Sequence, residues 1–165
     1  MFFMGMYKYI KQTLQKEYAA RSPEYRARLT SWGKQPTTIR VEKPTNLARA
    51  RELGYKARQG VVIVRARVKR GTRKRIKADL GRKPGKAGRF FSPGKSLQRI
   101  AEERANIHYP NCEVLNSYWV GATGQNKYFE VILYDRAHPA NKDMPKQVGR
   151  VFRGLTHSGK KGRSL

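Results

Sequence analysis

Gly94, Lys95 and Ser96 end like a phosphate-binding loop, a type of loop that holds nucleotides. The loop motif needs a further glycine five positions before Gly94, where this chain has Arg89. Pro93 and two preceding phenylalanines also crowd a loop that should offer free backbone amides to a phosphate. The pattern therefore predicts the start of a helix here and not a nucleotide-hydrolysing site.

A metal centre would need several histidine, cysteine or carboxylate ligands at suitable spacing. The histidines His108, His138 and His157 have no second histidine or carboxylate at the spacing of helical ligands. Cys112, the one cysteine, follows His108 by four positions across a proline. A closed zinc site takes four ligands, so these residues are interpreted as structural. No metal and no cofactor are predicted.

A general acid and base could in principle come from the adjacent carboxyl groups of Glu102 and Glu103. Neighbouring residues on a helix point in different directions, so this pair cannot flank one substrate bond. The expected role of the pair is a solvated or arginine-paired helix face. Without a convergent cluster of catalytic groups, the sequence predicts a protein that is not an enzyme and has no small-molecule substrate.

Charge is the strongest signal in the chain. Its 165 residues include 37 Lys and Arg against 11 Asp and Glu, for a formal net charge of +26. Such a chain repels itself when compact and favours a polyanionic partner, of which nucleic acid is the usual one. A membrane surface is the rival partner, but we find no amphipathic basic helix and no run of membrane-spanning length. With no signal peptide and a single cysteine, the protein is expected in the reducing cytoplasm.

Hydrophobic periodicity predicts an α+β fold, in which helices cover a small antiparallel or mixed four-stranded sheet. Helices are predicted at Gly5–Ala20, from a Ser22 cap to Gly33, from a Thr45 cap to Leu53, and at Ser96–Ile107. Strands are predicted at Thr37–Val41, Val61–Arg70, Val114–Val120 and Tyr128–Asp135, the last two forming a hairpin around a Gly121–Asn126 turn. The chain is divided into an N-terminal helical segment (1–35), an α+β core (36–138) with a long extended basic loop (69–91), and a basic C-terminal tail (139–165).

The strand Val61–Arg70 is predicted to connect the core with a charged partner. One of its faces is apolar throughout, whereas the other changes from Val61 and Ile63 to Arg65 and Arg67. The strand therefore begins between two covering layers and then runs toward negative charge. The loop that follows is dominated by Lys, Arg, Gly and Pro, and loops of such length usually carry function or lack order.

The predicted RNA-binding residues lie mainly in this loop and its flanks. Arginine offers planar, bidentate donors to phosphate and can stack on bases. A long flexible basic loop fits irregular folded RNA better than a regular duplex groove, with DNA as the close competitor. Tyr55 could stack on an exposed base or, with equal weight, pack against Leu53. The candidates are Arg49, Arg51, Tyr55, Lys56, Arg58, Arg65, Arg67, Lys69, Arg70, Arg73, Lys74, Arg75, Lys77, Arg82, Lys83, Lys86, Arg89, Arg150, Arg153, Lys160, Lys161 and Arg163.

Trp119, on the predicted hairpin, is assigned to the folded core and not to RNA stacking. Its strand neighbours Leu115 and Ser117 share its face, and no basic residue adjoins it in sequence. Truncation of a buried aromatic side chain costs about 3–5 kcal/mol, and we expect this cost for Trp119→Ala.

Several separated stretches carry a resemblance to a known family: MGMYKYI at 4–10, LGYKARQG at 53–60, SLQ at 96–98, AEERA at 101–105, VLNSYWVG at 114–121, FEVIL at 129–133 and RGLT at 153–156. Together they resemble the archaeal and eukaryotic large-subunit ribosomal protein family called L-fifteen-e, over nearly the whole chain and in the family's order. The resemblance implies an α+β core with a small antiparallel sheet and extended basic segments among RNA helices.

The same resemblance implies a structural constituent of the large ribosomal subunit in the cytoplasm, bound to large-subunit ribosomal RNA and beside neighbouring large-subunit ribosomal proteins. The alternative from a different class is an RNA-modifying or RNA-remodelling enzyme with a basic surface. An enzyme would need a pocket with convergent polar groups, which the sequence does not predict.

Overall fold

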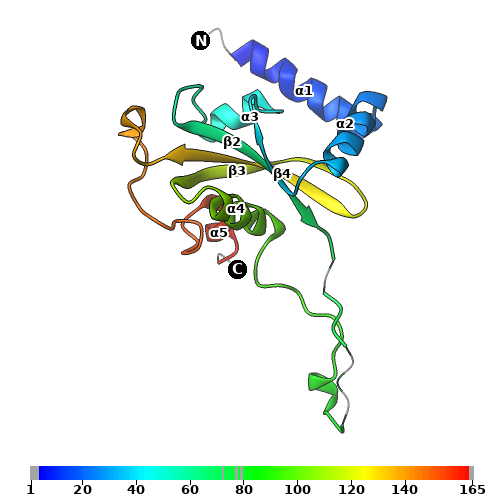
Figure 1. Ribbon diagram of the computed structural model, residues 1–165. Helices are drawn as coiled ribbons and strands as arrows, with labels where there is room; N and C mark the ends of the chain where they lie inside the picture. Colours follow the sequence, from blue (N-terminus) through cyan, green and yellow to red (C-terminus); the bar gives the residue numbers. More distant parts are fainter. Residues whose placement is uncertain (1–3, 72, 77, 79, 164–165) are drawn as a thin grey trace.

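The computed structural model describes residues 4–71, 73–76, 78 and 80–163, and it shows a sheet between two layers of helices (Figure 1). The helices are α1 (Met4–Ala20), α2 (Pro23–Lys34), α3 (Leu47–Glu52), α4 (Leu97–His108) and α5 (His157–Lys161), with 3-10 turns η1 (Pro84–Lys86) and η2 (Pro139–Asn141). The strands are β1 (Thr38–Val41), β2 (Val61–Lys69), β3 (Cys112–Ala122) and β4 (Asn126–Asp135). The predicted α+β class is confirmed.

The four strands form one sheet in the order β1-β2-β4-β3, and every neighbouring pair is antiparallel. The predicted hairpin is confirmed as β3 and β4, but both strands are longer than predicted. Gly121 and Ala122 still pair with Tyr128 and Lys127, so the turn is shorter than the predicted one. Irregular pairing between Trp119 and Gly121 interrupts the alternation that the sequence pattern assumed.

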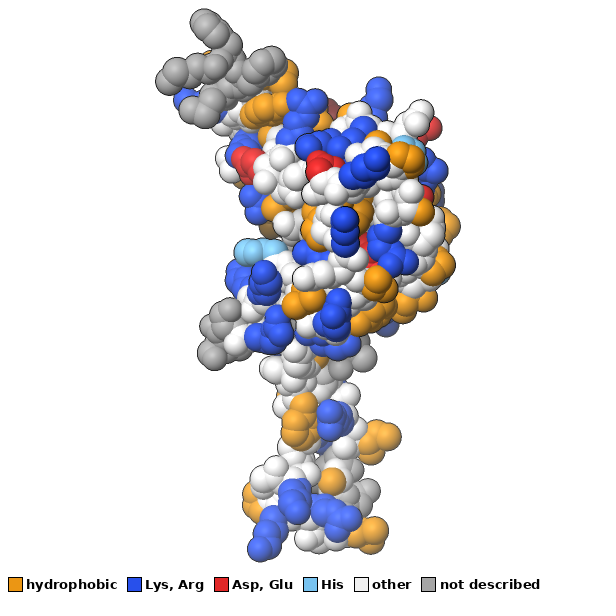
Figure 2. All heavy atoms as spheres, turned by 90° about the vertical axis from the view of Figure 1, so that its left-hand side faces the viewer, with side chains coloured by type: hydrophobic (Ala, Val, Ile, Leu, Met, Phe, Trp, Pro, Cys, Tyr) orange, Lys and Arg blue, Asp and Glu red, His pale blue; other side chains and the backbone are white. Residues whose placement is uncertain are grey.

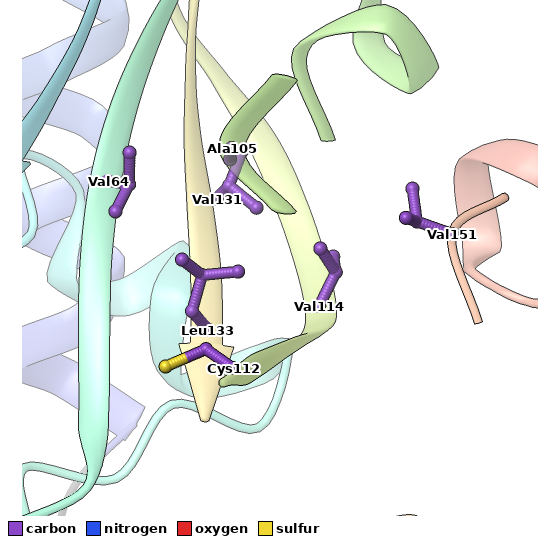
Figure 3. Close-up of a cluster of buried hydrophobic side chains, with 7 residues drawn as sticks. All are labelled: Val64, Ala105, Cys112, Val114, Val131, Leu133 and Val151. Carbon is purple, nitrogen blue, oxygen red and sulfur yellow. The ribbon is translucent and has the colours of Figure 1, made fainter. Parts of the chain in front are cut away.

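One core lies between the sheet and α4. Seven buried side chains form its main cluster, namely Val64, Ala105, Cys112, Val114, Val131, Leu133 and Val151 (Figure 3). Ala101 and Ala105 are fully buried on α4, and their small side chains let the helix lie close to the strands. Burial also raises the pKa of the Cys112 thiol, which therefore behaves as a small apolar side chain.

The opposite face of the sheet is covered by α1, α2 and α3. From α2, Tyr25, Leu29 and Trp32 cluster with Tyr128 of β4. From α3, Ala50 packs with Tyr118 and Ile132. With helices on both faces, β4 is buried over nearly its whole length, which explains its almost continuous apolar run.

Side-chain caps define the helix starts. The Ser22 hydroxyl accepts a hydrogen bond from the Tyr25 amide at 3.2 Å, as predicted. The predicted Thr45 cap is wrong, because the adjacent Asn46 caps α3. Thr45 instead donates its amide and its hydroxyl to the buried carboxylate of Glu130, at 3.0 and 2.5 Å. A buried carboxylate requires such donors, and this requirement displaced the cap by one residue.

The chain after Pro139 returns to the α4 core instead of forming a free tail. Val151 is fully buried there. The Glu113 carboxylate accepts hydrogen bonds from the backbone amides of Gly149 and Arg150, at 2.8 and 3.3 Å. Over its described residues, the predicted basic C-terminal extension is therefore a packed part of the fold. The scarcity of apolar residues in this segment suggested a free tail, but polar contacts hold much of the segment in place.

The structure also corrects the prediction made for Glu102. The predicted solvated or arginine-paired helix face is right for Glu103, which pairs with Lys95 and Arg99 at 2.9 and 3.1 Å. Glu102 is fully buried and accepts hydrogen bonds from serine and threonine hydroxyls. A carboxylate with hydroxyl donors from other elements can be buried without an arginine partner.

Candidate nucleic-acid interface

Strand β2 leads from the core to a long arm, defined here as residues 70–94, and side-chain exposure rises along the strand. Val64 is fully buried, Arg65 and Arg67 are half-buried, and Lys69 is exposed. The start of the strand lies between two covering layers, as predicted. Its end runs into the arm (Figure 1), and the side chain of Lys69 at that end is exposed.

The first two arginines of β2 bind within the protein. The guanidinium of Arg65 lies 4.3 Å from the ring centroid of Trp32 and donates to Gln35 Oε1 at 2.8 Å. Burial lowers the pKa of Arg65, although an arginine remains charged at neutral pH. Arg67 donates to the carbonyl of Gly33. Both side chains hold α2 against the sheet. They therefore have a structural role besides the RNA-binding role that was predicted for them.

The arm projects well away from the sheet (Figure 1). Its two limbs are joined by backbone hydrogen bonds, from the Arg75 amide to the Arg89 carbonyl at 2.7 Å and from the Phe91 amide to the Arg73 carbonyl at 3.1 Å. Near the tip the chain turns through η1. The segment predicted as an irregular loop is thus a narrow ribbon over part of its length, where backbone hydrogen bonds join its two limbs.

Exposed cations cover the arm, and Figure 2 shows Lys and Arg side chains gathered at its far end. Ile76, Leu80 and Phe90 are also exposed, so the arm offers apolar contacts between its charges. Across the described parts of the chain, no carboxylate forms an ion pair with these cations. Lys77 lies outside the described residues. The exposed arm cations are Arg70, Arg73, Lys74, Arg75, Arg82, Lys83, Lys86 and Arg89.

Candidates in the 49–58 region are partly neutralised by acids. Lys56 and Arg58 both reach the Asp143 carboxylate, at 2.9 and 2.5 Å. Their hydrogen bonds, with Arg58 contributing most, hold the pKa of Asp143 well below its ordinary value. Arg49 pairs with Glu52 at 2.9 Å. These cations therefore contribute less net positive charge to the surface than the sequence suggested.

Two other candidates of this region contact aromatic or apolar side chains. Arg51 donates to the hydroxyl of Tyr7 and lies 5.6 Å from its ring centroid. Tyr55 is half-buried and packs against the cluster of Ala50, Tyr118 and Ile132. Packing of Tyr55 is thus observed, while stacking of its remaining exposed surface on a base stays a prediction.

Most of the predicted RNA-binding residues in the C-terminal segment form hydrogen bonds within the protein that hold this segment in place. Arg150 donates to the Val114 carbonyl at 3.0 Å and Arg153 to the Val148 carbonyl at 2.5 Å. Arg163 donates to the carbonyl of Gly154 at 2.6 Å. Lys160 and Lys161 are exposed on α5. Three of these five predicted RNA-binding residues thus have backbone acceptors inside the protein.

A basic groove that sequence reasoning did not predict lies between α2 and the far end of the β3–β4 hairpin. It measures about 700 Å³ and has Tyr18 and Trp119 on its wall. Its basic side chains come from four separate places in the chain, namely Arg21, Arg26, Arg70 and Lys127. Only Arg70 was among the predicted site residues. The other three lie outside the dense basic runs of the sequence, so no local cluster of charge revealed them.

The assignment of Trp119 to the core is wrong. Its side chain is 38% exposed, on the edge strand β3. It contacts the Tyr18 ring edge-on, with 4.9 Å between the ring centroids and 82° between the planes. The irregular pairing next to Trp119 turned the strand, and basic residues remote in sequence surround it in space.

The residues first considered for catalysis have structural roles. Lys95 pairs with Glu103, and the Ser96 hydroxyl caps α4 by accepting from the Arg99 amide at 3.2 Å, so the predicted helix start is confirmed. Within the described ranges, no group of three or more His, Cys, Asp and Glu side chains could hold a metal ion. The helices that the structure describes include none that is long and apolar enough to cross a membrane.

Comparison with known protein families gives a match that spans almost the entire chain. Residues 5–165 match the model of the family described as Ribosomal L15. The match includes the arm, the groove and the C-terminal segment.

Proposed function

Because the chain belongs to the Ribosomal L15 family, we propose that it is a structural constituent of the large ribosomal subunit that binds large-subunit ribosomal RNA. Its place would be on the ribosome in the cytoplasm, beside other large-subunit proteins. The proposal gives the protein a scaffolding role and no chemical reaction.

The arm is the observation that carries the RNA-binding part of the proposal. It extends beyond the packed body and presents cations that lack carboxylate partners among the described residues. A chain with a net charge of +26 is destabilised by its own repulsion, most of all where like charges are crowded. Phosphate groups would relieve this repulsion, and arginine and lysine would release counterions on binding.

An arm of this shape fits folded RNA better than a regular DNA duplex. A narrow ribbon can pass between RNA helices and contact phosphates on several sides. A protein that reads the groove of a DNA duplex would instead need a rigid helix or a pair of strands. Exposed Phe90 and the Arg75 guanidinium, which lies 4.5 Å from the Phe91 ring centroid, add surfaces for unpaired bases.

The buried carboxylates argue against the alternative of an RNA-modifying or RNA-remodelling enzyme. Glu102, Glu113 and Glu130 are the most buried acids, and each is already engaged by hydroxyl or amide donors from distant segments. Such acids hold the fold together. A general base would instead have to face a substrate.

Co-sedimentation with ribosomal subunits tests the proposed function. The full chain should remain with large subunits through a high-salt wash and should not remain with small subunits. A cation-rich protein that merely adheres to RNA would be released from both subunits by the wash, because nonspecific phosphate contacts weaken steeply with salt. Release from the large subunit, or equal retention on both subunits, would overturn the proposal.

A further inference from the structure

The basic groove between α2 and the β3–β4 hairpin combines an aromatic wall with a cationic rim. Tyr18 and Trp119 are 39% and 38% exposed, although both belong to the folded body. Their rings meet edge-on, at 82° between the planes. A perpendicular contact does not cover both faces of a ring, and the exposed part of Trp119 offers a surface on which a planar partner can pack.

The cations of the groove surround this aromatic wall. Arg21 lies over the Tyr18 ring, with 4.7 Å from its guanidinium carbon to the ring centroid. Arg26 from α2 and Lys127 from β4 also line the groove. In the described part of the molecule, none of these three side chains forms an ion pair with a carboxylate. Among the residues described as lining the groove, none is acidic.

The two walls of the groove are held together by packing between α2 and the β3–β4 hairpin. Gly121 lets α2 approach the hairpin, because a Cβ atom there would lie 2.9 Å from Leu29 Cδ2 and 3.3 Å from the Trp32 ring. The Ala122 amide donates to the Tyr25 hydroxyl at 3.3 Å across the same junction. The spacing of the two walls is therefore set by packed residues before any ligand binds.

An aromatic surface beside several cations matches the chemistry of a single nucleotide. The base offers a planar ring for stacking, and its flanking phosphates offer negative charge. A volume of about 700 Å³ is in the range of sites that hold small organic ligands. A base within a regular duplex is already stacked on both faces, so the match is to an unpaired nucleotide.

We propose that this groove binds one unpaired RNA nucleotide, with its base stacked on Trp119 and its phosphates on Arg26 and Lys127. The proposal rests on the proposed function in so far as large-subunit ribosomal RNA would supply the nucleotide. It adds to that function a second contact site, which is built mainly from packed residues of the body and adjoins the arm at Arg70.

Tryptophan emission provides a direct test. The chain has two tryptophans, and Trp32 is buried at 6% exposure, so a loss of emission on ligand binding should come from Trp119. A short single-stranded RNA of mixed sequence should lower the emission of the wild-type chain. A hairpin duplex with the same number of phosphates should lower it far less, and the Trp119→Phe chain should show no comparable change with either RNA.

Affinity measurements on variants locate the contact. Trp119→Ala should weaken binding of the single strand about 5- to 150-fold, the loss of one stacked base, whereas Trp119→Phe should retain most of the affinity. Phe152→Ala removes an aromatic side chain of similar exposure outside the groove and should change nothing. Arg26→Gln with Lys127→Gln should lower the slope of log affinity against log salt by about 1.4, two phosphates on a single strand. Thermal melts should show that each variant is folded.

The outcomes separate this inference from the ribosomal role. If Trp119→Ala binds the single strand as tightly as the wild type, or if duplex and single strand lower the emission equally, the groove inference is overturned while subunit co-sedimentation stands. Emission that falls only on addition of large-subunit proteins would assign the groove to a protein partner, and that also overturns it. Loss of co-sedimentation with intact Trp119 quenching would instead overturn the proposed function and leave the groove as an RNA site.

Discussion

The hydroxyl of Thr156 donates a 2.7 Å hydrogen bond to the carboxylate of Glu102, although the two residues are 54 positions apart. Ser158 from the same segment and Ser117 from β3 donate to that carboxylate at 2.6 and 2.5 Å. All four side chains are buried. One acid of α4 thus joins the sheet to the C-terminal segment, and this contact explains how a segment with few apolar residues stays folded.

Replacing Glu102 by Gln should loosen the C-terminal segment. The amide keeps the size of the side chain but turns one acceptor oxygen into a donor, so at least one of the three hydroxyls loses its partner. An unsatisfied buried polar group costs about 1–3 kcal/mol, and we expect the free energy of unfolding to fall by that amount. Urea denaturation measures the loss, and limited proteolysis should cut the variant first between residues 139 and 163.

Glu103→Gln is the matched control, because Glu103 is the next residue on α4 and its ion pairs reach the surface. Partly exposed ion pairs contribute about 0–1 kcal/mol, so this variant should remain close to the wild type. Equal losses for the two variants would show that Glu102 does not have the joining role described here.

Gly121→Ala should separate α2 from the sheet. The added methyl group would meet Leu29, Trp32 and the Tyr25 hydroxyl at 2.9 to 3.3 Å. Overpacking of this kind costs about 1–3 kcal/mol, measured as a lower free energy of unfolding in urea. Gly124→Ala, in the turn of the same hairpin, adds a methyl group with nothing within 4 Å and should cost far less. A Gly121→Ala chain as stable as Gly124→Ala would mean that α2 can shift without penalty.

The sequence predicted the regular elements well because periodicity and caps are local signals. Alternation along β2 and β4 and the capping serine of α2 each lie within a few residues, and the structure confirms these elements. Both ends of β3 and the start of β4 were less well predicted, since only the partner strand decides where pairing ends. Thr45 shows the same limit, because Glu130, the acceptor that engages its hydroxyl in place of a capping role, is 85 positions away.

The candidate site was harder to predict than the fold, since it depends on residues that meet only in space. The arm was visible as a run of basic residues. The groove was not, because Arg21, Arg26 and Lys127 belong to different elements and Trp119 has apolar neighbours in sequence. The count of basic residues also overstated the positive charge that the candidates outside the arm present, because Asp143 pairs with Lys56 and Arg58 from another segment.

Asp143 should make part of the stability depend on pH. Hydrogen bonds from Arg58 and then Lys56 lower its pKa in the folded chain below the unfolded value of about 4. A depressed folded pKa means that the stabilisation is complete above the unfolded pKa and is lost as the pH falls through the folded pKa. Urea midpoints of the wild type and Asp143→Asn should therefore differ at pH 7 and converge in acid.

The dependence on salt concentration distinguishes the contribution of the Asp143 ion pairs from a general effect of acid on stability. The Asp143 side chain is exposed, so the difference between wild type and Asp143→Asn at pH 7 should shrink when the ionic strength rises. A difference that persists unchanged into strong acid would show that the carboxylate stabilises the chain by packing and not through its charge.

Neutralising the arm should affect RNA binding and leave the fold intact. Arg73, Lys74 and Arg75 are exposed and have no carboxylate partner among the described residues, so their joint replacement by Gln should leave the thermal midpoint close to that of the wild type. Binding to large-subunit ribosomal RNA should weaken, and the slope of log affinity against log salt should flatten by up to about three neutralised phosphates.

A second triple variant, with Gln at Arg49, Lys56 and Arg58, removes the same formal charge from cations that already pair with Glu52 or Asp143. Its salt slope should change less, because those cations would have to leave an acid before they could neutralise a phosphate. Melting curves and salt titrations on both triple variants make the comparison. If the paired cations prove as costly to lose as the arm cations, the main RNA contact lies on the body of the protein. If the arm variant unfolds, the arm is part of the core and not an extension aimed at RNA.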